Sequence, residues 1–465
     1  MTHVVIVGAG PAGMAAAEAA LRAGAQVSLL DAAEQPGGQY HRMLPTAFRA
    51  ERPQTIHHGW RAFDRRRGWV LGHPRCTWLN ETAVWSLEPR DDQPPRVRAL
   101  RGIADGADRE SITLHPDALV LATGAHDRVV PFPGWTLPGV FTAGAAQALA
   151  KGERLAVGEN VVVSGTGPFL LPVAASLVQV DTRVQAVFEA NQPRTVLRGW
   201  TRNPKELLPH LGKTAELAGY AAGQLRHRVP YRMGRAVIEA RGDGRVEEVV
   251  VARLRPDWTI IPGTERTLTT DAVCVGHGFT AQLELPAAAG CELGGDSVLV
   301  DAGQRTSRPG VFAAGEITGI AGAPSAVDSG TVAGWLAAGG DPGRITGALR
   351  RRDRGRAFGR RLAEAHPIGP GWTSWLRPDT VVCRCEAVDH ACLTRALTTP
   401  VTAGARSVKL ATRAGLGPCQ GRICGPAVAA LSAAAGAEVG RSHHRPIAQP
   451  IRLGELANLR TEENR

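Results

Sequence analysis

The residues best suited to chemistry are four cysteines near the C-terminal end of the chain, arranged as Cys383-x-Cys385 and Cys419-x4-Cys424. The other four of the eight cysteines are scattered, and each is most simply a small buried side chain. In a cytosolic chain, such clustering indicates a metal site or catalysis rather than structural disulfides. The four clustered residues are therefore candidate metal ligands.

A second chemical signal lies at the other end of the chain, where Gly8, Gly10 and Gly13 form a G-x-G-x-x-G motif. In such a loop the first glycine makes a tight turn, the second lets the backbone approach a pyrophosphate, and the third lets a helix pack closely on a strand. The pyrophosphate then lies at the helix N-terminus, which favours negative charge. Asp31, 23 residues after Gly8, stands where a carboxylate would bind ribose hydroxyls.

These residues need a strand–turn–helix–strand unit to position them, and the sequence predicts one. The apolar runs Val4–Val7 and Val27–Leu30 are typical of buried parallel strands, and a helical pattern extends from Pro11 to about Arg22. Pro11 and Ala12 complete the loop between Gly10 and Gly13. With both strands, the helix and the acid in register, a dinucleotide site is favoured over a chance glycine turn.

The same order of elements occurs again in the middle of the chain, with glycines at Gly165 and Gly167 and a strand that ends at Glu189. The third glycine is replaced by Leu170, whose larger side chain would push the helix away from the strand. A working NAD(P) site and a retained scaffold with a weak or altered site both remain open. A further helix is expected over Lys205–Arg226.

Other segments are expected to meet the cofactor of the N-terminal unit. A glycine-rich loop carries Gln39, and it would run beneath an isoalloxazine ring or, equally, be an ordinary solvent turn. Gly124 closes a buried strand, and Glu316 follows Gly315 after another strand, where its carboxylate would accept a hydrogen bond from a ribityl hydroxyl. The backbone of Val84 is placed to contact an adenine.

The composition fits a protein of two or three domains: 465 residues, 43% hydrophobic, 21% charged, with 55 glycines. No apolar run approaches a membrane span, and the first strand starts by residue 4, so the protein is expected to be cytoplasmic. The net charge of +11 comes from arginines spread along the chain, and nucleic-acid binding is not expected. The densest basic run, Arg350–Arg361, is read as a solvated helix or linker face rather than an acidic partner's docking surface.

The segments GAGPAG, ATGA, GTGPFLL and GVFAAGE, in this order, resemble the pyridine nucleotide–disulfide reductase class of flavoproteins. The resemblance implies FAD in the first domain and leaves NAD(P), ATP or nothing in the second. No C-x2-C or C-x4-C pair in either domain matches the disulfide branch, and Leu170 disfavours a simple NAD(P)H reductase. The FAD contacts that it implies are Gly8, Gly10, Gly13, Asp31, Gly124, Gly315 and Glu316.

The C-terminal segments VVCRCEAV and TRAGLGPCQGRICG resemble the bacterioferritin-associated-ferredoxin-like module, which binds a 2Fe–2S cluster through four cysteines. The resemblance assigns these ligands to Cys383, Cys385, Cys419 and Cys424. Four soft thiolates suit a binuclear iron cluster. Zinc is the competing interpretation, although a C-x-C pair is tighter than the usual zinc spacing, and iron–sulfur is preferred.

The whole combination resembles the alpha-type subunit of heteromeric amine and amino-acid dehydrogenases, a family that includes opine oxidase, hydrogen cyanide synthase and dye-linked proline or hydroxyproline dehydrogenase subunits. The resemblance implies a glycine-oxidase-like flavoprotein beta subunit that oxidises a C–N bond, while this chain carries electrons to an unknown acceptor. It also allows FMN at a subunit interface and a small third subunit. No catalytic residue is expected in this chain. The alternatives are a stand-alone NAD(P)H-dependent FAD reductase and an assembly scaffold with vestigial cofactors.

The expected fold is α/β, with two Rossmann-like dinucleotide-binding domains of the three-layer ββα type and a small C-terminal iron–sulfur module. The FAD-binding domain should be discontinuous, formed by residues 1–130 and 271–340, with the strand at Asp271–Phe279 returning to it. The remaining expected segments are 131–270 for the second dinucleotide-binding-like domain, 341–378 for an Arg-rich linker, 379–435 for the four-cysteine module and 436–465 for the tail.

Overall fold

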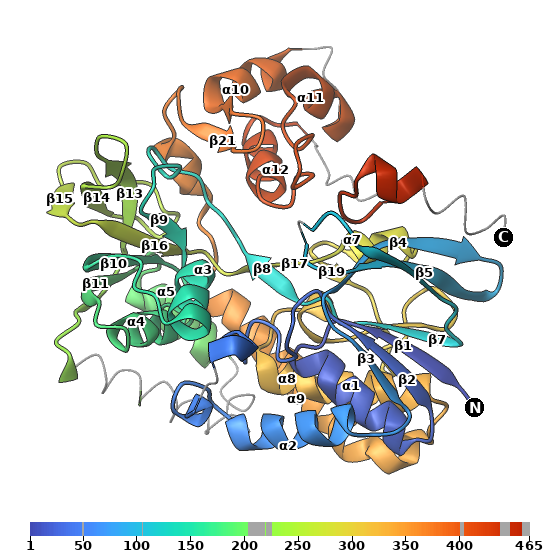
Figure 1. Ribbon diagram of the computed structural model, residues 1–465. Coiled ribbons are helices and arrows are strands. Elements are labelled where there is room, and N and C mark those ends of the chain that lie inside the picture. Colours follow the sequence, from blue (N-terminus) through green and yellow to red (C-terminus); the bar gives the residue numbers. More distant parts are fainter. Residues whose placement is uncertain are drawn as a thin grey trace. The chain divides into compact units, whose positions relative to one another are not determined.

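A computed structural model describes residues 1–48, 51–104, 106–202, 219, 226–399, 404–437 and 447–457. The chain divides into two compact units, each with its own sheets and helices (Figure 1). The first unit comprises Met1–His126, Thr280–Arg360 and His443–Arg465. The second unit comprises Asp127–Phe279 and Arg361–Ser442.

The first unit has three layers around a parallel sheet of order β20-β7-β1-β2-β3. Alternate residues of β1 face opposite layers, because side chains of a strand alternate. Val4 and Ile6 pack with the helices, whereas Val5 and Val7 pack with the antiparallel sheet β4-β5-β6. The elements are β1 His3–Val7, α1 Pro11–Arg22, β2 Gln26–Leu30, α2 Trp60–Leu71, β3 Cys76–Leu79, β4 Thr82–Arg90, β5 Gln93–Arg101, β6 Glu110–Leu114, β7 Ala118–Leu121, β20 Val311–Ala313 and α8 Ala323–Ala337.

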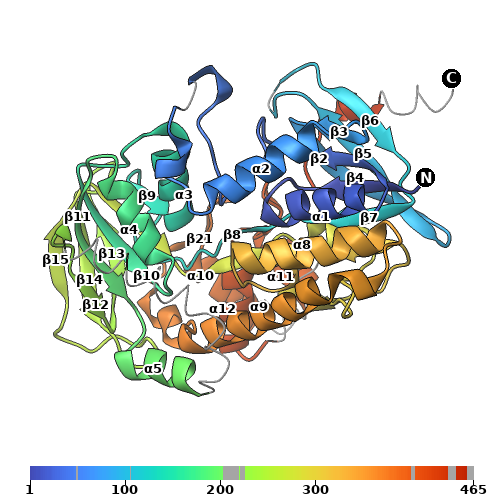
Figure 2. The ribbon, with the colours of Figure 1, turned by 90° about the horizontal axis from the view of Figure 1, so that it is seen from below.

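Helix α8 lies along α1 on the helical face of this sheet (Figure 2). The two backbones approach closely because α8 carries glycine where it meets α1. A Cβ at Gly330 would come within 2.0 Å of the carbonyl oxygen of Ala12, and a Cβ at Gly334 within 2.0 Å of that of Ala16. This contact ties α8 to the helix that follows the first glycine loop.

The second unit repeats the three layers around a parallel sheet of order β12-β11-β10-β16-β9. Val161 and Val163 of β10 pack on the side of α3 and α4, and Val162 packs toward the antiparallel sheet β13-β14-β15. The elements are β9 Val140–Thr142, α3 Ala143–Ala148, β10 Asn160–Gly165, α4 Leu170–Val178, β11 Arg183–Glu189, α5 Pro193–Thr201, β12 Tyr231–Met233, β13 Arg235–Arg241, β14 Glu248–Arg253, β15 Arg266–Thr269 and β16 Ala272–Gly276. The expected pair of Rossmann-like sheets is therefore confirmed.

One predicted strand placement is wrong. Strand β16 (Ala272–Gly276) does not return to the first domain, because it pairs in parallel with β10 from Val161 to Gly165 inside the second sheet. The chain re-enters the first unit only at Thr280. The helix predicted over Lys205–Arg226 lies outside the described residues, apart from Gly219 and Arg226.

The Arg-rich segment forms a helix of 20 residues, α9 (Thr346–Ala365). After it, short elements build the cysteine-bearing part of the second unit, where Val382, Leu393 and Leu431 share one apolar cluster with residues of β13 and β14. These elements are β21 Val381–Cys383, β22 Val388–Asp389, α10 His390–Thr398, α11 Ala405–Thr412 and α12 Gly425–Ala434. In the tail, Glu455 accepts two hydrogen bonds from Arg109 of the first unit, both 2.7 Å long. Across the described ranges, no helix is long and apolar enough to cross a membrane.

The α1–α8 contact yields a stability prediction. We expect Gly334→Ala to lower the free energy of unfolding by about 2 kcal/mol, because the added methyl would overlap the Ala16 carbonyl and force two packed helices apart. Gly68→Ala in α2 is the matched control, since a Cβ there meets nothing within 4 Å. The control should raise stability by about 0.5–1 kcal/mol through its helix propensity. Thermal unfolding of both variants checks this, and equal shifts would contradict it.

Candidate functional site

The first glycine loop leaves no room for side chains at its turn. Gly8 has φ +102°, and a Cβ there would lie 2.4 Å from the carbonyl oxygen of Ala122. A Cβ at Gly13 would lie 1.7 Å from the carbonyl oxygen of Gly8, so α1 starts directly against the strand end. The N-terminal N–H groups of a helix have no partner within that helix. The loop therefore has the shape and the dipole of an anion cradle, which fits the pyrophosphate of FAD.

Asp31 closes this loop from the end of the neighbouring strand. Its Oδ2 accepts a hydrogen bond from the N–H of Ala9 at 2.6 Å, and its Oδ1 accepts one from Ala33 at 2.8 Å. Burial raises the pKa of Asp31, and these two hydrogen bonds oppose the rise without cancelling it. Because a carboxylate offers about four lone-pair sites, Asp31 can accept further donors such as ribose hydroxyls.

The glycine-rich loop that follows lies on the first one. The N–H of Gly37 donates to the carbonyl of Ala9 at 2.8 Å, and a Cβ at Gly38 would lie 2.9 Å from the Cα of Gly10. The side chain of Gln39 is exposed and accepts a hydrogen bond from Arg42 at 2.6 Å. The backbone of this loop is thus near the cradle, while the Gln39 side chain points to solvent.

The remaining predicted FAD contacts lie at strand ends of the same unit. Gly124 and Gly315 both have positive φ, and a Cβ at Gly315 would lie 2.8 Å from the Cβ of Ala12 at the start of α1. Glu316 accepts hydrogen bonds from the N–H groups of Ala321 at 3.1 Å and Gly322 at 2.8 Å, so it orders the loop before α8.

Val84, the predicted adenine contact, is buried on β4. Its side chain lies in the apolar cluster between the two sheets of the first unit, and its backbone pairs with Ala99 of β5. The side chain therefore belongs to the core, and only the backbone of Val84 is a candidate for a base contact.

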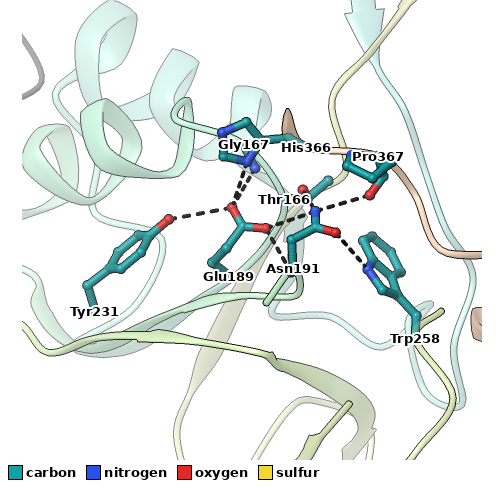
Figure 3. Close-up of polar contacts among 8 residues, drawn as sticks. All are labelled: Thr166, Gly167, Glu189, Asn191, Tyr231, Trp258, His366 and Pro367. Atoms are coloured by element: carbon teal, nitrogen blue, oxygen red, sulfur yellow. Dashed lines mark hydrogen bonds and ion pairs between the residues drawn. The ribbon is translucent and has the colours of Figure 1, made fainter. Parts of the chain in front are cut away.

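In the second unit, the carboxylate that corresponds to Asp31 is fully buried and surrounded by donors from the protein itself (Figure 3). Glu189 Oε1 accepts from the backbone N–H of Asn191 at 2.9 Å and from its Nδ2 at 3.2 Å. Oε2 accepts from the N–H of Gly167 at 2.8 Å and from the Tyr231 hydroxyl at 3.4 Å, and it lies 3.3 Å from Nδ1 of His366. Burial raises the pKa of Glu189, but His366 and the two amides outweigh burial and hold it below its usual value.

The helix after the second glycine loop begins later than its counterpart. Helix α1 starts at Pro11, directly after the second glycine, whereas α4 starts at Leu170, in the place of the third glycine. The first turn before α4 is closed by hydrogen bonds of the i to i−3 kind, from Leu170 to Gly167 at 3.3 Å. The Leu170 side chain is fully buried, which is why the close glycine packing of the first loop is not repeated.

Sequence reasoning did not find the partners of Glu189. Asn191, Tyr231, Trp258 and His366 belong to no motif, and His366 lies far along the chain, just after the arginine-rich helix. Trp258 supports this network from one side: its indole is fully buried, and its Nε1 donates to Asn191 Oδ1 at 3.2 Å. A buried polar side chain of this kind needs a partner, but sequence does not say which.

The four clustered cysteines meet in two pairs. The Cys424 thiol hydrogen-bonds to Cys383 and thereby lowers the pKa of Cys383. At Cys385, a backbone hydrogen bond with Cys419 opposes the shift, but burial and the Cys419 side chain outweigh it and raise the pKa. Cys383 and Cys424 are buried, whereas Cys385 is exposed and Cys419 is half-buried. Within the part of the chain that the structure describes, no group of three or more His, Cys, Asp or Glu side chains is gathered tightly enough to hold a metal ion.

The backbone around the cysteine pairs is shaped for close approach. A Cβ at Gly417 would lie 2.4 Å from the Cβ of Cys385, so the loop that carries Cys419 can pass the C-x-C segment only at a glycine. Backbone N–H groups of Cys385, Glu386 and Gly415 hydrogen-bond to the sulfur of Cys383. N–H groups directed at a cysteine sulfur stabilise the thiolate, the form in which cysteine binds metals.

Comparisons with known proteins show the family to which the chain belongs. The model of the family "Pyridine nucleotide-disulphide oxidoreductase" matches residues 2–330. A protein of Rhizobium meliloti that is named as a subunit of opine oxidase is 33% identical, over 98% of this chain and 87% of that protein. Hydrogen cyanide synthase subunit HcnB of Pseudomonas aeruginosa is also 33% identical, over 98% of this chain and 99% of that protein.

A solved structure has a similar fold over most of the chain. The crystal structure of L-proline dehydrogenase from P. horikoshii superposes with a TM-score of 0.66 and covers 98% of this chain and 79% of that one. The identity is 18%, so this likeness shows the fold alone. The family implies FAD, which fits the side-chain-free cradle at Gly8 and Gly13. The chain is therefore an oxidoreductase that belongs to the pyridine nucleotide-disulphide oxidoreductase family, in the branch that contains HcnB and the opine oxidase protein.

Proposed function

We propose that this chain is the FAD- and 2Fe–2S-containing electron-transfer subunit of a heteromeric dehydrogenase or oxidase. That complex would oxidise the C–N bond of an amino acid or opine, of the proline, hydroxyproline, opine or glycine class. Similarity to HcnB and to the opine oxidase protein, both of which are named as subunits, supports the heteromeric assembly and the C–N substrate class. The observation that carries the proposal is the approach of the two cysteine segments in a chain of this family: Cys383 and Cys424 share one buried cluster, and a Cβ at Gly417 would lie 2.4 Å from the Cβ of Cys385.

The residues of the first unit would hold FAD by backbone and carboxylate contacts. Gly8, Gly10 and Gly13, with Pro11 and Ala12 between them, would face the pyrophosphate. Asp31 would accept ribose hydroxyls, Glu316 a ribityl hydroxyl, and the loop at Gln39 would lie beneath the ring, with Gly124 and Gly315 giving the chain room to pass. FAD supplies two-electron chemistry, and a 2Fe–2S cluster supplies one-electron transfer. This chain's residues would bind and orient these groups.

The donor set fits an iron–sulfur cluster better than it fits zinc. A binuclear cluster takes two thiolates on each iron, which matches two thiol pairs, whereas a structural zinc site gathers four thiolates around one ion. The Cys383-x-Cys385 pair is also tighter than the C-x2-4-C spacing with which zinc sites usually begin. The N–H groups at Cys383 and the exposure of Cys385 would both set the potential of such a cluster.

The substrate chemistry would take place on a partner. We infer a glycine-oxidase-like flavoprotein beta subunit, with FMN at the subunit interface and a small third subunit as further components that the family allows. No residue of this chain is assigned a catalytic role, and the electron acceptor is left open. The rival function, a stand-alone NAD(P)H-dependent FAD reductase, needs Glu189 to bind a ribose, although the protein's own donors surround that carboxylate.

The central test is a pair of cysteine variants in the assembled complex. We expect Cys419→Ser to abolish amine-dependent reduction of an artificial dye and to remove the visible bands of the cluster, while FAD stays bound. Cys392→Ser is the matched control, because Cys392 lies in the same module but outside the four clustered cysteines, and it should keep both signals. The complex is co-purified with the proteins encoded beside this chain, and iron and zinc are measured by mass spectrometry. Bound zinc in place of iron, or full dye reduction by Cys419→Ser, would refute the proposed role.

A second prediction concerns the approach of the two cysteine segments. We expect Gly417→Ala to weaken iron retention by about tenfold, because the new methyl would displace Cys385 from its partner. Gly425→Ala at the start of α12 is the control, since a Cβ there meets nothing within 4 Å. Iron per chain after dialysis against a chelator measures the effect. Equal retention by both variants would show that the position of Cys385 does not matter for metal binding.

A further inference from the structure

The carboxylate of Glu189 stands opposite Gly165, just as Asp31 stands at the end of the strand beside Gly8. In a dinucleotide-binding fold this is the position that accepts the adenosine ribose hydroxyls. A carboxylate offers about four lone-pair sites. At Glu189, two donors approach Oε1 and three approach Oε2, all of them from the protein. No lone pair is left for a ribose hydroxyl.

Two of these partners connect Glu189 to the segment Ala365–Pro367. His366 lies 3.3 Å from the carboxylate by its Nδ1, and its side chain is 9% exposed. Asn191, which donates to Glu189, also donates from Nδ2 to the carbonyl oxygen of Pro367 at 3.0 Å (Figure 3). The segment is therefore bonded to the carboxylate directly and through its neighbour.

The same segment is held from its other sides by tight packing. Ala365 is fully buried, and a Cβ at Gly199 of α5 would come within 2.3 Å of the Cα of Ala365. The ring of Trp200 meets that of His366 edge-on, with centroids 6.1 Å apart. Further along, a Cβ at Gly369 would lie 2.5 Å from the indole of Trp258. These contacts fix the segment as part of the packed core of the second unit.

We propose that the segment Ala365–Pro367 is an internal plug that occupies the adenosine-ribose position of the second dinucleotide fold and excludes NADH and NADPH. The ring of His366 takes the place of the ribose hydroxyls, with its Nδ1 3.3 Å from Oε2 of Glu189. The late start of α4 at Leu170 removes the close helix–strand packing of the glycine loop as well. This inference goes beyond the proposed function, because it assigns a specificity role to residues of the second unit whatever the amine substrate is.

The test compares three forms of the FAD-loaded chain. We expect the unmodified protein to show no NADH binding up to about 1 mM, a usual upper limit for enzyme substrates, when energy transfer from tryptophan to nicotinamide is measured. His366→Ala leaves Oε2 of Glu189 with the Gly167 N–H and the long 3.4 Å contact of the Tyr231 hydroxyl, which a ribose hydroxyl can displace. This variant should bind NADH at least about tenfold more tightly, the gain of one charge-assisted hydrogen bond. His227→Ala, an exposed histidine of the same unit, is the matched control and should behave as the unmodified protein does.

NADH binding by the unmodified protein would overturn the plug, as would a folded His366→Ala that releases the segment and still binds no NADH. Should that variant fail to fold, hydrogen exchange on the unmodified complex decides. The amides of Gly167 and Asn191 should stay protected and unchanged when about 1 mM NAD+ is added, the same upper limit, and loss of their protection would refute the proposal. If NADH binding contradicts the plug, the proposal that the complex reduces a dye with electrons from an amine is unaffected. If Cys419→Ser contradicts the electron-transfer role, the exclusion of NADH and NADPH is unaffected, so the two failures can be told apart.

Discussion

A buried carboxylate must be satisfied, and this requirement is met differently in the two halves of the chain. Each Rossmann-like sheet ends its second strand with an acid beside a glycine loop, and each acid accepts a loop N–H, from Ala9 to Asp31 and from Gly167 to Glu189. Glutamate is one methylene longer and reaches one residue further along its loop. The carboxylate of Asp31 can still accept hydrogen bonds from a ligand, whereas side chains and backbone groups of the protein surround the carboxylate of Glu189. On the proposed plug, the first fold therefore binds a dinucleotide and the second does not.

The second unit uses its layers to support the cysteine-bearing part. The indole of Trp375 stacks on that of Trp258 with centroids 6.1 Å apart, and its Nε1 donates to the Trp258 carbonyl at 2.9 Å. Trp135 donates to the carbonyl of Val381, two residues before Cys383, at 2.6 Å. Arg377 forms an ion pair with Glu239 at 2.7 Å. The dinucleotide scaffold therefore positions the C-x-C segment, which gives a reason to keep this Rossmann fold whether or not it binds a nucleotide.

Sequence patterns predicted what is local and missed what is distant. Helix α1 has its predicted bounds, Pro11–Arg22, because loop glycines and apolar runs are written in consecutive residues. The placement of Ala272–Gly276 failed because a uniformly apolar strand carries no mark of the sheet that it joins. The plug was not predicted because Asn191 and Pro367 lie 176 residues apart, and proline and histidine after a basic helix have no motif that links them to a glycine loop. The four cysteines were identifiable by spacing, but their pairing depends on loops that meet only in the fold.

The four clustered thiols differ in burial, and this difference decides from which side a redox partner could reach a cluster bound to them. Cys383 and Cys424 are 1% and 3% exposed, and backbone N–H groups bond to Cys383, whereas Cys385 faces solvent. Burial among apolar side chains disfavours added negative charge, whereas hydrogen bonds to sulfur favour it. The two irons of a 2Fe–2S cluster bound here would therefore have different surroundings. A redox partner would meet the Cys385 and Cys419 edge first, since the other edge is covered by Val388 and Ala414. If a cluster is bound here, packing would limit access to it on the Cys383 side, and on that same side backbone donors would adjust its potential.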